Sequence, residues 1–360
     1  MDIYGMIDAE RFQMNYLLEI YRKIVPERVR KTCNEWLQKQ RISRDNRRDM
    51  ERKNCGDKNK KETFYVIRTD STQRWGIATT CSMVLNGIKY AVDRGWIPVI
   101  DYQNYFLVGI QDEGNRGKEN AWEYYFEQPD PRYSLEEVYR SRNVILGPVR
   151  GQPHGSLSWN DIKDVLDDRY IPYFDCAAKY LRMKPEIIKR AEEMRQTLFG
   201  RAVGEKILGV GMRAGLYWGT VLKSSDYNGH PGGLSIDEYI EMAHKYMGEF
   251  DCGYIFVSCD DRYYLERMKQ EFGEKCLYMS GRTLAHFFDE EGKPIREEKD
   301  RAVEFAAQGE RERTTDYLIE IYLLSICDSL FRVQGGGSLL ACLLNNRKYE
   351  HYYLADRGTQ

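Results

Sequence analysis

Short apolar runs alternate with amphipathic segments along the second half of the chain. The apolar runs cover residues 207–210, 254–258, 276–279 and 329–333. Runs of this kind are typical of strands that are buried on both faces of a parallel sheet. Residues 235–247 and 316–324 carry apolar side chains at three- and four-residue spacing, which predicts helices. Strands and helices in alternation predict an α/β domain with a parallel sheet.

A second pattern of strands and helices precedes this one. Strands are predicted at residues 64–68, 96–101 and 143–146, and a helix at residues 82–94. A strand, a glycine-containing turn, a helix and a further strand form one βαβ unit. We therefore expect two Rossmann-like domains, the first at residues 62–200 and the second at residues 201–360.

The beginning of the chain has a different character. Residues 8–53 show helical spacing of apolar side chains, and residues 22–61 hold 15 Lys and Arg against 6 Asp and Glu. This predicts a basic helical extension at residues 1–61. Such a segment suits contact with an anionic membrane surface or with a partner. A solvated helix face followed by a linker explains the same charges, and we favour that interpretation.

Composition narrows the class of protein. A length of 360 residues favours two domains, and a net charge of −2 gives no sign of nucleic-acid binding. The nine cysteines are scattered without a C-x-x-C motif, so we expect free thiols and no zinc site. No apolar run approaches the length of a membrane span. These features predict a cytoplasmic protein, with contact at the inner membrane face through residues 22–61 as an alternative.

Candidate ligand-binding residues follow the predicted strands of the second domain. The strand at 207–210 runs into Gly211 and Arg213, and the strand at 254–258 is followed by Asp260 and Asp261. Open α/β sheets bind ligands at this edge, and the planar fork of an Arg suits a phosphate or a carboxylate. A surface Arg in a salt bridge is the alternative interpretation.

A glycine-rich turn stands between the last predicted strand and an apolar helix. It has the sequence Gly335-Gly336-Gly337-Ser338. Such a turn exposes backbone N–H groups at the positive end of a helix, which favours an anion. Steric needs of a tight turn explain glycine equally well.

Candidates for a second ligand lie in the first domain and in a loop. Asp101 ends a predicted strand, and residues 120–129, which include Trp122 and Glu123, are dense in aromatic rings and carboxylates. This composition suits a glycan, although a packed amphipathic helix explains it as well. The loop at residues 214–233 adds Asp226 and His230.

The order of parts between residues 205 and 345 resembles the nucleotide-binding half of the GDP-fucose-dependent fucosyltransferases. These are the α1,6- and protein O-fucosyltransferases, with the α1,2 group more distant. The family has a first strand ending in H-x-R-R or H-x-R-x-x-D, a second ending in a T/S-D-D-like motif, and a Leu-Ser-x-x-Asp segment, here Leu324 to Asp328. The resemblance implies the GT-B fold, two Rossmann-like domains facing across a cleft, in a bacterial relative that acts in polysaccharide biosynthesis.

The resemblance also implies roles for single residues. Arg213 aligns with an arginine that contacts the diphosphate of the donor, and Glu320 with an acidic residue that accepts from guanine N1–H and N2–H₂. Asp260 and Asp261 match an acidic pair that shapes the nucleotide pocket. The turn at residues 335–338 matches a serine-rich turn at the phosphate, of which Ser338 keeps the hydroxyl. The donor implied is GDP-fucose, with no metal or other cofactor.

Two positions depart from the family pattern. Gly211 stands where the family usually has His, and Ala214 replaces a second Arg. An inverting transfer needs positive charge on the departing diphosphate and a base for the acceptor's proton. Arg213 can supply the charge. The base candidates are Asp226, Glu123 and Asp101, followed by His230.

The function predicted from the sequence is that of an inverting glycosyltransferase, which moves L-fucose from GDP-fucose to a glycan. Because Gly211 and Ala214 replace family residues, a catalytically silent relative that binds a nucleotide or a glycan is an alternative. An unrelated α/β nucleotide-binding protein is a third. The acceptor, the linkage and the oligomeric state stay open.

Overall fold

The computed structural model of the chain describes residues 50–69, 76–103, 118–149, 157, 167–214, 234–295 and 310–355. The chain divides into two compact units, Met1–Asp49 and Met50–Gln360, and all described residues belong to the second. The predicted basic extension therefore lies outside the described residues, except for residues 50–61. Among the described residues, no helix is both long and apolar enough to cross a lipid bilayer.

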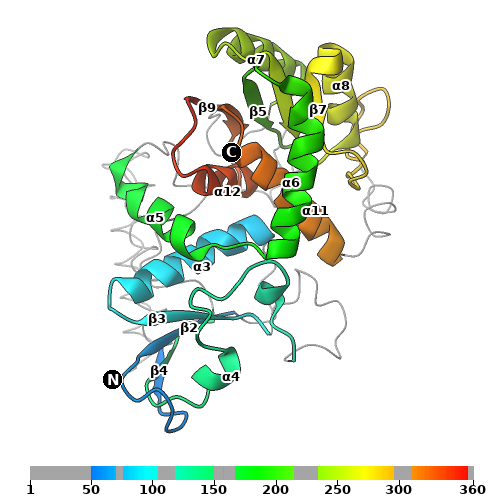
Figure 1. Ribbon diagram of the computed structural model, residues 1–360. Coiled ribbons are helices and arrows are strands. Elements are labelled where there is room, and N and C mark those ends of the chain that lie inside the picture. Colours follow the sequence, from blue (N-terminus) through cyan, green and yellow to red (C-terminus); the bar gives the residue numbers. More distant parts are fainter. Residues whose placement is uncertain are drawn as a thin grey trace, which may run out of the picture. The chain divides into compact units, whose positions relative to one another are not determined.

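The second half of the chain forms a five-stranded sheet (Figure 1). Its strands, listed from one edge to the other, are β7 (Cys276–Tyr278), β6 (Tyr254–Ser258), β5 (Ile207–Gly211), β8 (Ser329–Val333) and β9 (His351–Ala355). All neighbouring strands are parallel. The strand order reverses direction between β5 and β8. In open α/β sheets this is the point where ligands bind, outside the carboxyl ends of the strands.

Helices cover both faces of this sheet. One face carries α6 (Pro185–Phe199), α11 (Glu310–Ser325) and α12 (Gly336–Asn345), over a core that includes Phe256 and Leu330. The other face carries α7 (Ile236–Glu249) and α8 (Arg262–Phe272), over a core that includes Leu208 and Phe331. Successive residues of each strand thus pack on opposite faces, which is why the strands read as continuous apolar runs.

The first half forms a four-stranded sheet in the order β1 (Glu51–Lys53), β4 (Val144–Leu146), β2 (Phe64–Arg68) and β3 (Ile97–Asp101). Helix α3 (Ile77–Val92) connects β2 to β3, and α4 (Leu135–Val138) and α5 (Ile171–Tyr180) follow. Strands β4, β2 and β3 are parallel. The helix predicted at residues 51–53 is wrong: these residues form β1, which pairs antiparallel with β4. All three are exposed and charged, so they suit an edge strand.

The N-terminal ends of α12 and α3, one from each sheet, lie against each other. Helix α12 packs against α3 and α5 in one shared core. A Cβ added to Gly336 would lie 3.2 Å from Thr79 Oγ1, so the start of α12 lies against the first turn of α3. Each of these helices follows the carboxyl end of a strand of its own sheet, β8 and β2. The predicted α/β fold with two Rossmann-like sheets is confirmed.

Most predicted elements are present at nearly the predicted bounds. The predicted cap of α7 is confirmed, because Ser235 and Glu238 form a reciprocal capping box. Helix α3 begins at Ile77, earlier than predicted, and β9 was not predicted. The cysteines within the described residues are all free thiols, as predicted.

Candidate functional site

The donor-side residues predicted from the sequence converge on one hollow at the carboxyl ends of β5, β6 and β8. Its lining includes Gly211, Arg213, Asp260, Glu320, Gly335, Gly336, Gly337 and Ser338, which are all of the predicted residues except Asp261. It also includes Ser258, Cys259 and Tyr317, which were not predicted. These residues come from segments far apart in the sequence. The hollow lies where the strand order reverses, the expected ligand-binding point of such a sheet.

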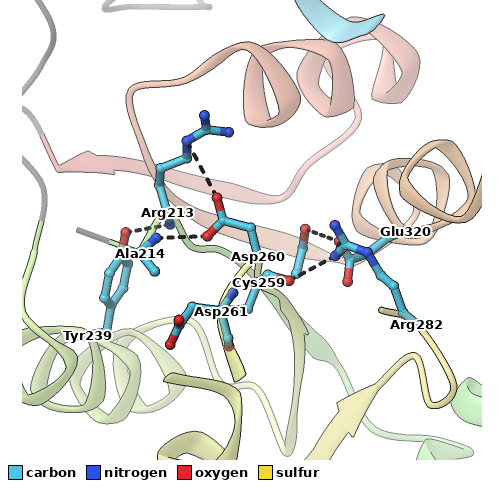
Figure 2. A network of polar contacts seen from close by, with 9 residues as sticks. Arg213, Ala214, Tyr239, Cys259, Asp260, Asp261, Arg282 and Glu320 are labelled. Atoms are coloured by element: carbon cyan, nitrogen blue, oxygen red, sulfur yellow. Dashed lines mark hydrogen bonds and ion pairs between the residues drawn. The ribbon is translucent and has the colours of Figure 1, made fainter. Parts of the chain in front are cut away.

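The backbone that carries Arg213 is fixed from two sides. The Arg213 N–H donates to Tyr239 Oη at 3.0 Å, and the Ala214 N–H donates to Asp260 Oδ1 at 2.9 Å. Burial raises the pKa of Tyr239 well above its usual value, so this acceptor stays a neutral hydroxyl. Figure 2 shows the guanidinium extending past the Asp260 carboxylate, with Nε 3.6 Å from Asp260 Oδ2. The side chain of Arg213 is 38% exposed and can reach a ligand.

The two neighbouring aspartates have different roles. Asp261 is fully buried and accepts from the N–H groups of Tyr264 at 3.0 Å and Phe287 at 2.7 Å. It is the N-cap of α8, and burial raises its pKa to about 6. Of the two aspartates, which the sequence predicts together as donor-binding residues, only Asp260 lines the hollow, while the Asp261 carboxylate caps α8.

Glu320 is held at the inner end of the hollow. Its side chain is 4% exposed, and Oε2 accepts from Ser258 Oγ at 3.0 Å and from Arg282 Nη1. Arg282 Nη1 also donates to the Cys259 carbonyl at 2.8 Å (Figure 2). Burial raises the pKa of Glu320, and the Arg282 guanidinium opposes the rise. Because no described residue donates to Oε1, that oxygen is the one left for a ligand.

Tyr317 lies directly on the glycine turn. A Cβ added to Gly337 would lie 2.0 Å from Tyr317 Oη, so the turn requires glycine at this position. The Arg282 guanidinium stands 5.3 Å from the centre of the Tyr317 ring. The hollow that remains has a volume of about 40 Å³, room for a few water molecules. A larger ligand therefore occupies more than this space, beside a wall that includes Tyr317 and Glu320.

The hydroxyl of Ser338 is already used within the protein. It donates to the Val333 carbonyl at 2.8 Å and accepts from Arg332 Nη1 at 3.1 Å. The predicted contact of this hydroxyl with a phosphate therefore lacks support, and the amides at the start of α12 remain. Ser338 also explains the glycine at position 211, where an added Cβ would lie 3.3 Å from Ser338 Cβ. A His at this position would require the turn to move.

The acceptor-side candidates are dispersed. Trp122 is 1% exposed, stacks on Phe126 with ring centres 4.5 Å apart and donates to the Glu127 carbonyl. Its predicted contact with an acceptor is wrong, since composition does not show which way a ring faces. Asp101 accepts from the Tyr139 hydroxyl, and Glu123 lines a second hollow. Asp226 and His230 lie outside the described residues.

Arg282 and Tyr317 were missed for different reasons. Tyr317 precedes Glu320 by three residues, and such pairs share one face of a helix, so the sequence carried a signal for it. Arg282 lies 38 residues from Glu320 in a segment without helical or strand periodicity, and no sequence signal marks it. Within the described part of the chain, no group of His, Cys, Asp or Glu could hold a metal ion.

Comparison with known proteins finds similarity only among solved structures. No family model and no curated protein sequence matches the chain. The NodZ α1,6-fucosyltransferase soaked with GDP-fucose is 16% identical over 79% of this chain and 93% of its own, with a TM-score of 0.43. FUT1 of Arabidopsis thaliana in complex with GDP is 10% identical over 83% and 72%, with a TM-score of 0.44. POFUT1 in its apo form is 11% identical over 82% and 74%, with a TM-score of 0.33.

The solved structures that this chain is similar to are fucosyltransferases, the class that the motifs of residues 205–345 resemble. At these identities a shared fold does not determine activity, which depends on the residues of this chain's own site.

Proposed function

We propose that this chain is an inverting glycosyltransferase that binds GDP-fucose in the hollow at the carboxyl ends of β5, β6 and β8. One observation carries the proposal. Residues chosen from their motifs alone, Arg213, Asp260, Glu320 and the turn at 335–338, line a single hollow at the reversal point of the second sheet. Their convergence supports a shared ligand, and the family they resemble uses GDP-fucose.

Two helix starts and one Arg supply positive charge for the diphosphate. The caps of α12 and α3 are Gly335 and Gly76, and neither helix has a side-chain cap. Their first amides are therefore left for a ligand. The start of α12 lies against the first turn of α3, so the positive ends of two helix dipoles come together near Arg213. Such a site favours an anion even without a metal ion.

Glu320 supports guanine as the base. A guanine edge presents two adjacent donors, N1–H and N2–H₂, and Oε1 of Glu320 has room to accept from them. Uracil and adenine do not present this pair of donors at the same edge. Because Tyr317 lines a hollow of only about 40 Å³, binding of GDP-fucose includes a movement of this side chain.

The transfer itself is a single displacement. An acceptor hydroxyl oxygen attacks the anomeric carbon, and the bond from that carbon to the diphosphate oxygen breaks with inversion. The electron pair leaves on GDP, where Arg213 and the helix starts stabilise the developing charge. The hydroxyl proton passes to a base. Asp226, Glu123 and Asp101 remain the candidates for this base.

The test is release of GDP from GDP-fucose after addition of a mixture of bacterial surface glycans. Stoichiometric GDP and fucosylated glycan are expected, with at least about 100-fold less product for Arg213→Ala, since charge-assisted contacts to the leaving group are removed. Binding of GDP-fucose without turnover on any glycan would instead establish a catalytically silent binding protein. The filled space at Gly211, where the family has His, favours that second candidate.

A further inference from the structure

A second, larger hollow lies at the carboxyl end of β3 in the first sheet. Its volume is about 490 Å³. The lining comes from the exit of β3, from the short 3-10 helix Ala121–Tyr124, from residues 127–133 and from the start of α4. A volume of this size accommodates a monosaccharide or disaccharide without rearrangement. The carboxyl end of a strand is also where open α/β sheets place their ligands.

Glu123 is held in this hollow by neutral groups. Its Oε1 accepts from Asn120 Nδ2 at 3.2 Å and from Gln128 Nε2 at 2.6 Å. Both amide side chains are hydrogen-bonded to the backbone of Ile100 near the end of β3. Asn120 Nδ2 donates to the Ile100 carbonyl at 2.7 Å, and the Ile100 N–H donates to Gln128 Oε1 at 2.9 Å. No described residue donates to Glu123 Oε2. One oxygen of a rigidly held carboxylate is thus left for a ligand in the hollow.

The charges of the lining favour a neutral polar ligand over a phosphate. The lining includes three carboxylates, those of Glu123, Glu127 and Glu136, and two ammonium groups, those of Lys118 and Lys184. Glu127 already pairs with Arg182 at 3.0 Å. A lining that holds both acceptors and donors matches the hydroxyls of a sugar, which donate and accept in turn. The ring of Tyr133, fixed edge-to-face on Phe64, offers an apolar face to sugar C–H groups.

We propose that this hollow binds a saccharide and that Glu123 Oε2 accepts a hydrogen bond from one of its hydroxyls. The proposal that a saccharide binds here rests only on the geometry of this hollow. That the bound sugar is the acceptor of a transfer rests on the function proposed above.

The experiment is saturation-transfer NMR on the whole protein with a panel of neutral sugars, made of hexoses, N-acetylhexosamines and their disaccharides. The test variant is Glu123→Gln, which keeps an Oε1 acceptor for Asn120 and Gln128 but replaces the free carboxylate oxygen by an amide. The matched control is Glu193→Gln, an exposed carboxylate that does not line the hollow. At least one sugar is expected to bind, with affinity reduced about 10-fold or more in Glu123→Gln and less than about 2-fold in Glu193→Gln.

A thermal-shift titration with GDP on the same samples separates the two proposals. If sugar binds and depends on Glu123 while GDP does not bind, the saccharide site stands and the proposed transfer fails. If GDP binds but no sugar does, or the sugar signal is the same in Glu123→Gln, the saccharide site is overturned. Binding of short neutral peptides in place of sugars at this hollow would overturn it as well.

Discussion

The two hollows each present a glutamate to a ligand, but the groups that hold the two glutamates differ in charge. Each lies at the carboxyl ends of parallel strands, and each holds a glutamate by one oxygen while the other has no donor among the described residues. Glu320 is held by a cation, Arg282, at 4% side-chain exposure. Glu123 is held by two neutral amides in a half-exposed wall. A carboxylate paired with a guanidinium suits the N–H donors of a nucleotide base, and a carboxylate held by neutral amides suits the hydroxyls of a polyol.

The hollows also differ in the volume that is open to a ligand. The first has about 40 Å³ and is lined by Tyr317 and Glu320 among others, whereas the second has about 490 Å³. We infer that a nucleotide enters by displacing side chains and that a sugar enters a preformed site. Two residues of the same type can therefore suit different ligands, because the groups that hold each glutamate determine which ligand its other oxygen can bind.

The largest expected effect comes from breaking the Arg282–Glu320 pair. Arg282→Ala leaves a buried carboxylate without its cation and is expected to lower the free energy of unfolding by about 3–5 kcal/mol in urea denaturation. The double variant Arg282→Met with Glu320→Leu is expected to recover most of that loss. Lys89→Ala, in an exposed pair with Asp93, is the control and should change stability by less than about 1 kcal/mol. An equal loss of stability in Arg282→Ala and Lys89→Ala would show that the buried pair contributes no more to stability than an exposed pair does.

Closure of the first hollow predicts a coupling between Gly337 and Tyr317. Gly337→Ala is expected to cost about 1–3 kcal/mol, because the added Cβ would overlap the Tyr317 hydroxyl. Tyr317→Phe removes the overlapping oxygen, so the double variant should regain at least about 1 kcal/mol relative to the sum of the single changes. Additive effects would mean that Tyr317 does not lie on the turn. Gly248→Ala, on a helix position with open space, is the control.

The pH dependence of stability tests the structural role of Asp261. Its folded pKa of about 6 lies above its ordinary value of 3.8. A raised pKa means that the folded state binds the proton more tightly, so the stability contribution is present below about pH 4 and is lost as pH rises through 6. Wild type should therefore lose about 1–3 kcal/mol relative to Asp261→Asn between pH 4 and pH 7. Parallel stability curves would contradict this account.

The smallest expected effect is that of removing metal ions. Since Arg213 and the starts of α12 and α3 supply the positive charge in our proposal, EDTA should change GDP affinity by less than about 2-fold. The measurement is fluorescence-detected or calorimetric GDP binding with and without chelator. A loss of about 10-fold or more, restored by Mg²⁺ or Mn²⁺, would show that a metal completes the site.

The sequence predicted the second sheet and its ligand edge well because both depend on local signals. Continuous apolar runs specify strands that are buried on both faces, and the residues after β5, β6 and β8 then have to share one edge. Strand β9 was missed because it lies at the edge of the sheet and only its last residue is buried, so it lacks the continuous apolar run that marks the inner strands. Asp261 precedes a helix, so its role as an N-cap was readable from the sequence.

What the sequence could not predict depends on contacts between distant segments. Arg282 reaches Glu320 across 38 residues, and Gln128 reaches Ile100 across 28. Trp122 and Glu123 are neighbours, yet one faces the core and the other a hollow, because a short 3-10 helix separates their directions. Composition showed that aromatic and acidic residues gather at 120–129. Only the packing on Phe126 and Ile100 shows which of them is available to a ligand.

The most direct test of the central claim is a calorimetric titration of GDP, UDP and ADP into wild type, Arg213→Ala and Glu320→Gln, with Asp261→Asn as the control. We predict micromolar GDP binding, at least about 30-fold weaker in Arg213→Ala and about 10-fold weaker in Glu320→Gln, with UDP and ADP weaker throughout. Asp261→Asn should bind GDP as wild type does, because Asp261 does not line the hollow. Equal binding of all three nucleotides, or GDP binding that is indifferent to Arg213, would contradict the assignment of this hollow as a guanine-nucleotide site.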